Sequence, residues 1–354
     1  MEAATNVAAR RRLRPVASGA PLGVGVIGTG RIGSAHARLL AGAVPGARVT
    51  ALTDTRPQAA RMLGAELGVR TLTGAEELLA SPDVEAVAIC SSTDTHAELL
   101  VAAAAAGKPI FCEKPVSLDL AEVDRALRAV EDANVQFQIG FNRRFDPAHA
   151  SVQAAVADGT VGEPHLVRIT SRDPEPPPLS YVLASGGIFL DMTIHDFDMA
   201  RFVSGSEVVE VFARGALRVE PSFAHAGDVD TAVVTLTHEN GCLSVIDNSR
   251  RAAYGYDQRV EVLGSRGLAA SENPACHSGL VRTAEGTRTT VPPAFFLERY
   301  HESYRRQWSA FICAVVAGET PPVTTHDARA PLVMGLAARR SLEEGRPVRI
   351  DEIQ

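Results

Sequence analysis

Asp191 and His195 stand four residues apart in the stretch from Gly186 to Asp198, a spacing that could support acid–base chemistry. On a helix, residues i and i+4 face the same way, so the carboxylate could orient and support the imidazole. Histidine suits the removal of an alcohol proton because its ordinary pKa lies near neutrality. Two other interpretations remain open: a structural pair on a helix surface, or a metal site that would lack a third His or Cys ligand nearby.

Lys114 follows the apolar run 109–112 within the sequence Glu113-Lys114-Pro115. A lysine placed directly after a buried strand is costly unless it is paired or functional. In a parallel sheet this position lies at the carboxyl end of the strand, where ligands bind. Lys114 is therefore a candidate site residue at this edge of the sheet, and the alternative is an exposed lysine in the turn before Pro115.

A glycine-rich motif, GxGxxG, occupies Gly28, Gly30 and Gly33 between a predicted strand and a predicted helix. In a dinucleotide site the first glycine permits the tight turn and the second lets the backbone approach the pyrophosphate. The third allows close packing of helix on strand. The motif alone is weak evidence, but Asp54 ends the second predicted strand, where a carboxylate would bind the adenosine ribose hydroxyls. We therefore predict a dinucleotide site rather than a plain glycine-rich turn.

The cofactor predicted from this site is NAD, because a carboxylate at Asp54 would repel the 2'-phosphate of NADP. Arg56 could in principle bind such a phosphate, and otherwise is a solvated loop arginine. The segment from Cys90 to His96 leaves a buried strand at its carboxyl end and is expected to line the nicotinamide side, although Thr95 could instead cap the next helix. The complete predicted NAD-binding set is Gly28, Thr29, Gly30, Arg31, Ile32, Gly33, Asp54, Thr55, Arg56, Ser91, Ser92, Thr93, His96, Glu113 and Lys114.

Short β-rich runs alternate with helical patterns from Leu22 to about Gln138, which predicts a doubly wound parallel sheet covered on both faces. The predicted strands are 23–27, 48–53, 86–91, 110–112 and 136–139, and the predicted helices are 32–41, 57–67, 75–80, 97–106 and 120–133. After about Phe145 the pattern changes to alternating segments separated by turns, which indicates an open, mainly antiparallel sheet in an α+β domain. These segments are 166–171, 208–217, 231–238, 241–249 and 258–263.

Three regions follow from this pattern. Residues 1–20, with a basic cluster from Arg10 to Arg14, are expected to be a disordered leader; a twin-arginine export signal is disfavoured because no apolar segment precedes a cleavage site. Residues 21–141 are the predicted dinucleotide-binding Rossmann domain, and residues 142–354 the predicted substrate-binding and oligomerisation domain. A last predicted helix, Pro331 to Glu344, could cover either domain.

The composition excludes several classes of function. With 35 Lys plus Arg against 42 Asp plus Glu, the net charge of -7 would repel a nucleic-acid backbone. No run of about 18 apolar residues indicates a transmembrane helix. The five cysteines are far apart and form neither a disulfide framework nor a zinc motif, so the sequence predicts a cytoplasmic protein without a metal site.

Several blocks of sequence together resemble the inositol 2-dehydrogenases of the glucose-fructose oxidoreductase, inositol dehydrogenase and rhizopine catabolism family (Gfo/Idh/MocA). They are GTGRIG at 28–33, EKP at 113–115, GFNRRFDP at 140–147, SRDPEPPP at 171–178, SGGIFLDMTIHDFDMAR at 185–201, YGYDQRVEVLGSRG at 254–267 and FFLERY at 295–300. The resemblance covers nearly all of the chain after residue 20. GxGxxG and EKP mark only the superfamily, whereas the 185–201 block and YGYDQR are closer to the inositol branch.

The resemblance implies a catalytic triad of Lys114, Asp191 and His195. His195 would remove the hydroxyl proton as hydride passes to nicotinamide C4, Asp191 would hold and polarise the histidine, and Lys114 would stabilise the substrate oxygen. It also implies that Arg144 and Tyr254 contact other hydroxyls of the ring; the alternatives are a surface salt bridge and a core-facing aromatic. Relatives vary near 171–173, and among these three residues Asp173 is expected to contact the substrate.

The function implied by the resemblance is NAD-dependent oxidation of a small polyol, with myo-inositol converted to 2-keto-myo-inositol (scyllo-inosose). The alternatives are a dehydrogenase of another cyclitol or of a pyranose sugar, or a regulator that senses NAD(H) without turnover. A homotetramer is implied as well, through the open sheet of the second domain.

Overall fold

Six parallel strands form the first sheet of the protein, which a computed structural model describes for residues 19–353. The strand order, β3-β2-β1-β4-β5-β6, is that of a doubly wound dinucleotide-binding sheet. Most of the predicted leader, residues 1–18, lies outside the described residues. The strands are β1 (Leu22–Ile27), β2 (Ala47–Thr53), β3 (Arg70–Thr71), β4 (Ala86–Ile89), β5 (Ile110–Cys112) and β6 (Phe137–Ile139).

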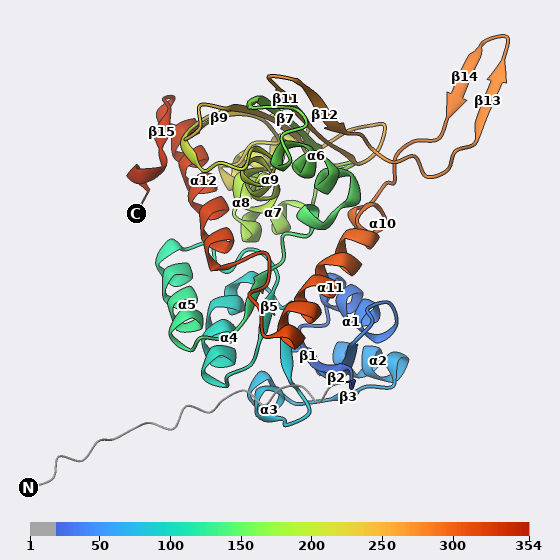
Figure 1. Cartoon of the computed structure of the whole chain (residues 1–354), viewed down its shortest axis with the longest axis vertical. Coiled ribbons are helices and arrows are strands. Elements are labelled where there is room, and N and C mark those ends of the chain that lie inside the picture. The colour runs from blue at the N-terminus through green and yellow to red at the C-terminus, as the bar shows by residue number, and fades with distance from the viewer. Residues whose placement is uncertain (1–18, 354) are drawn as a thin grey trace, which may run out of the picture.

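Helices cover both faces of this sheet (Figure 1). One core lies between the sheet and α3, α4 and α5, and the other lies between the sheet and α1 and α2. The helices are α1 (Arg31–Gly42), α2 (Pro57–Leu67), α3 (Ala75–Ala80), α4 (Thr93–Ala105) and α5 (Leu120–Asp132). The strands are buried on both faces, as a parallel sheet between two helical layers requires.

A seven-stranded mixed sheet forms the second domain, in the order β12-β11-β7-β10-β9-β8-β15. Its pairs are antiparallel except β7 with β10, which run parallel. The predicted fold class, a Rossmann domain followed by an open and mainly antiparallel sheet, is therefore confirmed. The strands are β7 (Pro164–Arg172), β8 (Val208–Ala216), β9 (Thr231–His238), β10 (Leu243–Ser249), β11 (Asp257–Gly264), β12 (Gly267–Ser271) and β15 (Val348–Arg349).

One face of the second sheet packs on helices, and the alternating burial of its strands shows which side chains face them. The other face carries exposed side chains such as Val233 and Leu243, and no element within residues 19–353 packs over it. The short helices of this domain are η1 (Asn142–Phe145), α6 (Pro147–Ala157), α7 (Leu179–Ser185), α8 (Gly187–Asp191), α9 (Ile194–Ser204), η2 (Pro221–Ala226) and η3 (Ile350–Glu352).

Two long C-terminal helices return to the junction of the domains. Trp308 and Phe311 of α11 (His301–Ala317), which the sequence analysis places in the second domain, pack into the core of the first domain against α1 and β5. Helix α12 (Thr325–Glu344) contributes Leu332 to the first core and Met334 to the second. It begins at Thr325 rather than at Pro331 because the Thr324 and Asp327 side chains form a capping box six residues earlier than predicted.

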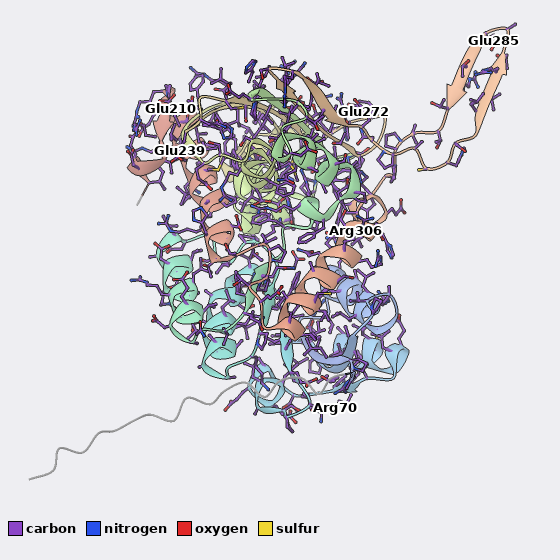
Figure 2. All side chains as sticks on the ribbon, in the orientation of Figure 1. Arg70, Glu210, Glu239, Glu272, Glu285 and Arg306 are labelled. Atoms are coloured by element: carbon purple, nitrogen blue, oxygen red, sulfur yellow. The ribbon has the colours of Figure 1, made fainter. Side chains whose placement is uncertain are left out.

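A two-stranded hairpin, β13 (Leu280–Thr283) and β14 (Gly286–Thr289), stands away from the body between β12 and α10 (Phe296–Arg299). All eight strand residues are exposed, and Glu285 lies at the tip (Figure 2). The sequence analysis does not predict this hairpin. An isolated pair of strands this short is only marginally stable in water, which suggests a partner surface.

Two kinds of feature, membrane-spanning helices and groups of metal ligands, are absent from residues 19–353. Within residues 19–353 no helix is long and apolar enough to cross a membrane. In the same residues no three His, Cys, Asp or Glu side chains are grouped as metal ligands would be.

Candidate active site

The loop between β1 and α1 has the geometry that a bound pyrophosphate needs. Gly28 has a φ of +91°, and a Cβ there would lie 2.5 Å from the Ser91 backbone nitrogen. A Cβ on Gly33 would lie 2.0 Å from the Gly28 carbonyl oxygen, so only glycine lets α1 pack this closely on the strand. A Cβ on Gly30 would meet no atom of the described residues within 4 Å, which leaves open space where the loop faces a ligand. The residues present fit a dinucleotide.

Asp54, at the end of β2, faces the same loop. One carboxylate oxygen accepts hydrogen bonds from the Thr29 backbone nitrogen (2.7 Å) and hydroxyl (3.0 Å), and the other accepts one from the Arg56 backbone nitrogen (2.8 Å). Burial opposes the charge, but these hydrogen bonds outweigh it and lower the pKa of Asp54. Asp54 is therefore a fixed anion beside the loop, as a ribose-binding carboxylate must be. Thr55 and Arg56 are exposed in the loop that follows.

The segment after β4 places Ser91, Ser92 and Thr93 between that strand and α4, next to Gly28. Thr95 does not cap α4: it lies in the first turn, and its hydroxyl donates to the Ser92 carbonyl (2.7 Å). His96 is buried, and its ring nitrogens lie 2.8 Å from the Pro115 carbonyl oxygen and 3.0 Å from that of Ser91. His96 therefore joins two loops of the site, and its contact with NAD stays a prediction.

Lys114 lies at the carboxyl end of β5, as predicted, and reaches across to the second domain. Its ammonium donates to the Asp191 backbone carbonyl (3.0 Å) and lies 3.6 Å from the Asp191 carboxylate. Both side chains are largely buried. The structure therefore brings together two of the three predicted catalytic residues across the domain junction.

The described residues show no hydrogen bond or ion pair between Asp191 and His195, so their expected pairing stays a prediction. Asp191 ends α8 and His195 belongs to α9, so the two do not share one continuous helix. The chain breaks at residues 192–193, where the Thr193 hydroxyl hydrogen-bonds to the Asn248 side chain (2.6 Å). The i, i+4 spacing of a single continuous helix therefore does not describe this pair.

His195 still lies in the same cluster. Its Nδ1 atom is buried and has no hydrogen-bond partner among residues 19–353. The imidazole packs edge-on against Phe141, with ring centroids 5.9 Å apart. Burial, together with the positive charges of Lys114 and Arg143, holds the pKa of His195 well below its usual value. His195 is therefore held neutral, and its Nδ1 atom is left without a partner in the described part of the chain.

Arg250 takes the place beside Asp191 that the histidine was expected to occupy. Its two terminal nitrogens each lie 3.2 Å from one Asp191 oxygen, and one of them lies 3.3 Å from Asp173. The Tyr181 hydroxyl donates to the other Asp191 oxygen (2.9 Å). Burial opposes ionisation, but Lys114, Arg250 and this hydroxyl outweigh it and lower the pKa of Asp191. Asp173 thus lies in the cluster, as predicted, and burial raises its pKa.

Sequence reasoning missed Arg250 and Tyr181. Arg250 directly follows β10, and nothing in its sequence context separates it from its exposed neighbour Arg251. Tyr181 comes from α7, whose sequence carries no motif. Only the folded chain brings these two side chains to Asp191.

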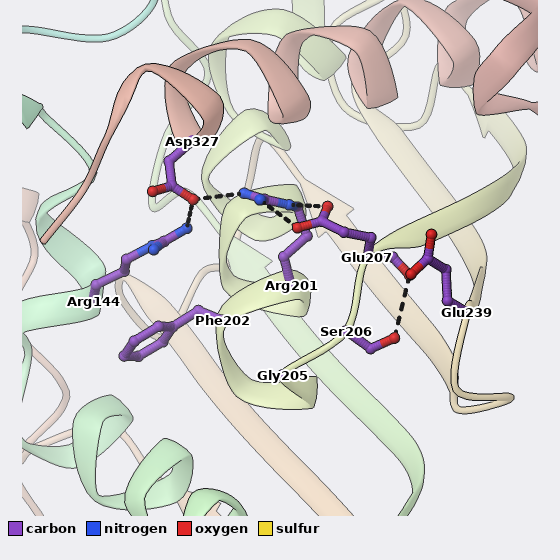
Figure 3. A pocket seen from close by; sticks show the side chains of 8 residues that line it. All are labelled: Arg144, Arg201, Phe202, Gly205, Ser206, Glu207, Glu239 and Asp327. Atoms are coloured by element: carbon purple, nitrogen blue, oxygen red, sulfur yellow. Dashed lines mark hydrogen bonds and ion pairs between the residues drawn. The ribbon is translucent and has the colours of Figure 1, made fainter.

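Arg144 makes its ion pairs outside this cluster, and its expected contact with substrate stays a prediction. Its guanidinium binds the buried Asp198 (2.6 Å) and Asp327 (2.8 Å), and Asp327 also binds Arg201 (3.1 Å). These groups border a separate pocket of about 420 Å³ beside the start of α12 (Figure 3). Arg143, the residue before Arg144 in η1, instead pairs with the buried Asp196 (2.6 Å). The two arginines differ in their partners because successive residues of η1 face different sides.

Tyr254 also lies elsewhere. Its ring is largely exposed, and its hydroxyl interacts with Arg172 (2.9 Å) and Asp257 (2.6 Å) at the far edge of the second sheet. Tyr256, two residues later, is buried, and the electrostatic influence of Arg143 and Asp173 on its phenol places it near the site. The expected contact of Tyr254 with substrate stays a prediction.

The arrangement can remove a proton from an alcohol beside a dinucleotide. Lys114 and His195 converge at the carboxyl edge of the first sheet, where doubly wound folds bind their ligands. A cation near the reacting oxygen and a neutral imidazole near its proton are the groups that such a reaction requires.

Comparison with known proteins agrees with this geometry. Residues 22–141 match the oxidoreductase family with an NAD-binding Rossmann fold, and residues 149–270 match the GFO/IDH/MocA C-terminal domain. The chain is 50% identical to a myo-inositol 2-dehydrogenase of Thermotoga maritima over 93% of this chain and 99% of the relative.

Solved structures are similar throughout. A probable dehydrogenase from Thermotoga maritima superposes with a TM-score of 0.92 at 49% identity, covering 94% of this chain and 100% of the other. A scyllo-inositol dehydrogenase from Lactobacillus casei, solved with NAD(H) and scyllo-inositol, superposes with a TM-score of 0.88 at 29% identity, covering 94% and 99%.

Proposed function

Since this chain belongs to the GFO/IDH/MocA family and is an NAD-dependent oxidoreductase, we propose that it oxidises a secondary hydroxyl of a cyclitol, converting myo-inositol to 2-keto-myo-inositol. The observation that carries the proposal is the neutral His195, with its free Nδ1, beside Lys114 at the edge of the first sheet. The relative with 50% identity bears the name myo-inositol 2-dehydrogenase, which supports this substrate.

NAD supplies the hydride acceptor when it is bound. The glycine loop and Asp54 would hold its pyrophosphate and ribose. His195 accepts the hydroxyl proton, and its low pKa keeps it in the basic form at neutral pH. The Lys114 ammonium donates a hydrogen bond to the same oxygen and stabilises the charge that develops there.

Asp191 acts on Lys114 in this proposal and not on the histidine. It holds the ammonium at the domain junction, while Arg250 and Tyr181 fix the carboxylate. Asp173, on the other side of Arg250, is proposed to accept a hydrogen bond from a second ring hydroxyl. Several closely spaced carboxylates and cations suit a ligand that carries several neighbouring hydroxyls.

Reduction of NAD and of NADP by a panel of cyclitols and hexoses tests the proposal. We expect myo-inositol with NAD to give the highest kcat/KM. A hexose oxidised far more efficiently than any inositol would overturn the cyclitol assignment. Activity lost in Lys114→Met and in His195→Ala, with NAD binding retained, would support their assigned roles.

A second candidate function is the oxidation of another cyclitol or of a pyranose sugar by the same residues. The observation in its favour is the similar structure that binds scyllo-inositol. The two inositols differ only in the orientation of one hydroxyl, so the same panel distinguishes them.

We further propose that the protein assembles as a homotetramer through the uncovered face of the second sheet. A cross-strand row of leucines crosses four strands of this face: Leu243, Leu166, Leu263 and Leu268. Three of them are more than 40% exposed, which is unusual for a contiguous apolar row on a soluble monomer. The projecting β13–β14 hairpin starts from the strand at the edge of this row.

Light scattering at fixed protein concentration tests the assembly. We expect the mass of four chains for the wild type and a smaller mass for the double substitution Leu243→Ser with Leu263→Ser. Met62→Ser is the matched control, because Met62 is an exposed apolar residue on α2, remote from the second sheet. A wild-type monomer, or a leucine variant of unchanged mass, would contradict the proposal.

A further inference from the structure

Three buried side chains from distant parts of the chain form a hydrogen-bonded row behind Lys114. The Trp308 indole nitrogen donates to His36 Nδ1 (2.8 Å), and His36 Nε2 lies 2.7 Å from Glu113 Oε1. Trp308 comes from α11, His36 from α1 and Glu113 from the end of β5. All three are almost fully buried. The row therefore links the helix of the dinucleotide loop to the residue that precedes Lys114.

The donor at one end fixes the proton of the histidine. An indole nitrogen can only donate, so His36 Nδ1 must be an acceptor. A neutral His36 then carries its proton on Nε2, the nitrogen that faces Glu113. Trp308 thus ensures that His36 donates to the Glu113 carboxylate.

Glu113 has little room to move as long as this bond is present. Its second oxygen accepts a hydrogen bond from the Lys114 backbone nitrogen (3.3 Å). A Cβ on Gly140 would lie 3.0 Å from the carboxyl group, so the glycine makes space for it. The carboxylate is nevertheless next in sequence to a lysine whose ammonium is bound to Asp191.

From this arrangement we propose that His36 is a positioning residue that keeps the Glu113 carboxylate away from the Lys114 ammonium. A buried carboxylate without a donor is strongly destabilised and seeks the nearest cation. Without the His36 N–H, the Glu113 carboxylate is expected to attract the ammonium of Lys114, the next residue in the chain. Lys114 would then leave Asp191 and the substrate oxygen. This inference rests on the proposed role of Lys114 in catalysis.

The chain offers a direct measurement, because its only two lysines are Lys108 and Lys114. An amine-reactive ester followed by peptide mass spectrometry reports the modification rate of each lysine without any substrate. Lys108, whose ammonium lies near the Ser81 carbonyl (3.3 Å) at the opposite end of the strand, is the internal control.

Two variants of His36 differ by one methylene. His36→Asn keeps an acceptor for Trp308 but cannot reach Glu113, whereas His36→Gln extends an amide N–H toward it. In His36→Asn we expect Lys114 to react about tenfold more slowly relative to Lys108, because its amine is then drawn from the domain junction into a pair with the buried Glu113 carboxylate. In His36→Gln the rate should return toward that of the wild type. Equal rates in all three proteins would overturn the proposal.

Kinetics in two backgrounds separate positioning from general damage. With the substrate identified by the panel, His36→Asn is expected to lower kcat about tenfold, with little change in KM for NAD. In a Glu113→Gln background the same substitution should have little effect, because the competing charge is gone. An equal loss in both backgrounds would show that His36 does not act through Glu113.

Two further results keep the interpretation unambiguous. If His36→Asn fails to fold, His36→Phe keeps an aromatic ring but removes the N–H toward Glu113, and the same slower labelling of Lys114 is expected. If no cyclitol is oxidised but labelling changes as described, the proposed substrate is wrong while the role of His36 stands.

Discussion

Replacing Arg250 by methionine tests the electrostatic centre of the site. Arg250 is almost fully buried and holds two carboxylates, Asp191 and Asp173. Methionine has a similar length and no charge, so the substitution leaves both carboxylates in place without their shared cation. Arg251→Met is the matched control, because the neighbouring arginine pairs with Glu175 at the surface.

The expected loss follows from the contacts. Removing one partner of a buried ion pair destabilises a protein by about 3–5 kcal/mol, because the other charge stays buried. Asp191 keeps Lys114 and the Tyr181 hydroxyl, so we expect the lower end, about 3 kcal/mol. Arg251 is about half exposed and its partner Glu175 is mostly exposed, so for Arg251→Met we expect a loss of stability of less than about 1 kcal/mol.

The loss should depend on pH in a definite direction. In the folded protein the pKa of Asp191 lies below its ordinary value: burial opposes the charge, but Lys114, Arg250 and a tyrosine hydroxyl outweigh it. Such a group stabilises the fold above its unfolded pKa, and this contribution disappears as the pH falls through the folded pKa. Arg250→Met removes part of it. The difference from wild type should therefore be full near pH 7 and shrink below about pH 4.

Urea unfolding followed by circular dichroism, at one protein concentration, measures these differences as midpoints and slopes. Activity is expected to fall with stability, since Asp191 would no longer be held beside Lys114. Equal midpoints for Arg250→Met and Arg251→Met would refute the reasoning. So would a loss in Arg250→Met that grows as the pH is lowered.

Three other substitutions and one pH profile test the remaining assignments. His195→Ala should lower kcat by about 10² to 10⁴, and an unchanged rate in a cyclitol assay would remove it from the mechanism. The acid limb of the wild-type kcat/KM profile should lie below pH 6.5, because burial and nearby cations keep His195 neutral; a limb above pH 7 would contradict this. Asp54→Ala should reduce the preference for NAD over NADP by at least about tenfold, as measured by the ratio of kcat/KM values. Arg144→Met should lower the urea midpoint while changing KM for the cyclitol by less than about twofold, since Arg144 pairs with Asp198 and Asp327; a large rise in KM would place it at the substrate.

The sequence was sufficient for the dinucleotide half of the site. Gly28, Gly30 and Gly33 lie within six residues between a predicted strand and a predicted helix, and Asp54 ends the next predicted strand. The position of Lys114 could also be predicted, because a residue that directly follows a strand of a parallel sheet lies at the carboxyl edge of that sheet. These positions follow from the order of residues along the chain, so they can be inferred without any knowledge of long-range contacts.

The part of the site outside the dinucleotide loop is formed by contacts between residues that are distant in the sequence, and the order of residues along the chain does not determine these contacts. The ion pairs of Arg144 with Asp198 and Asp327, and the exposure of Tyr254, could not be predicted, because side-chain direction in a turn or loop follows from its packing. Likewise, the packing of α11 on the first domain was not predicted, because only the folded chain brings Trp308 beside His36.

The sequence by itself therefore determined the fold class, the cofactor loop and the identity of the candidate acid–base residues. Only the tertiary structure decided which of them are partners. Asp191 and His195 are four residues apart, yet the break between α8 and α9 separates them, and Arg250 from a distant strand binds the carboxylate instead. The physical reason is that a buried carboxylate needs a cation, and which cation it finds is set by the packing of the folded chain.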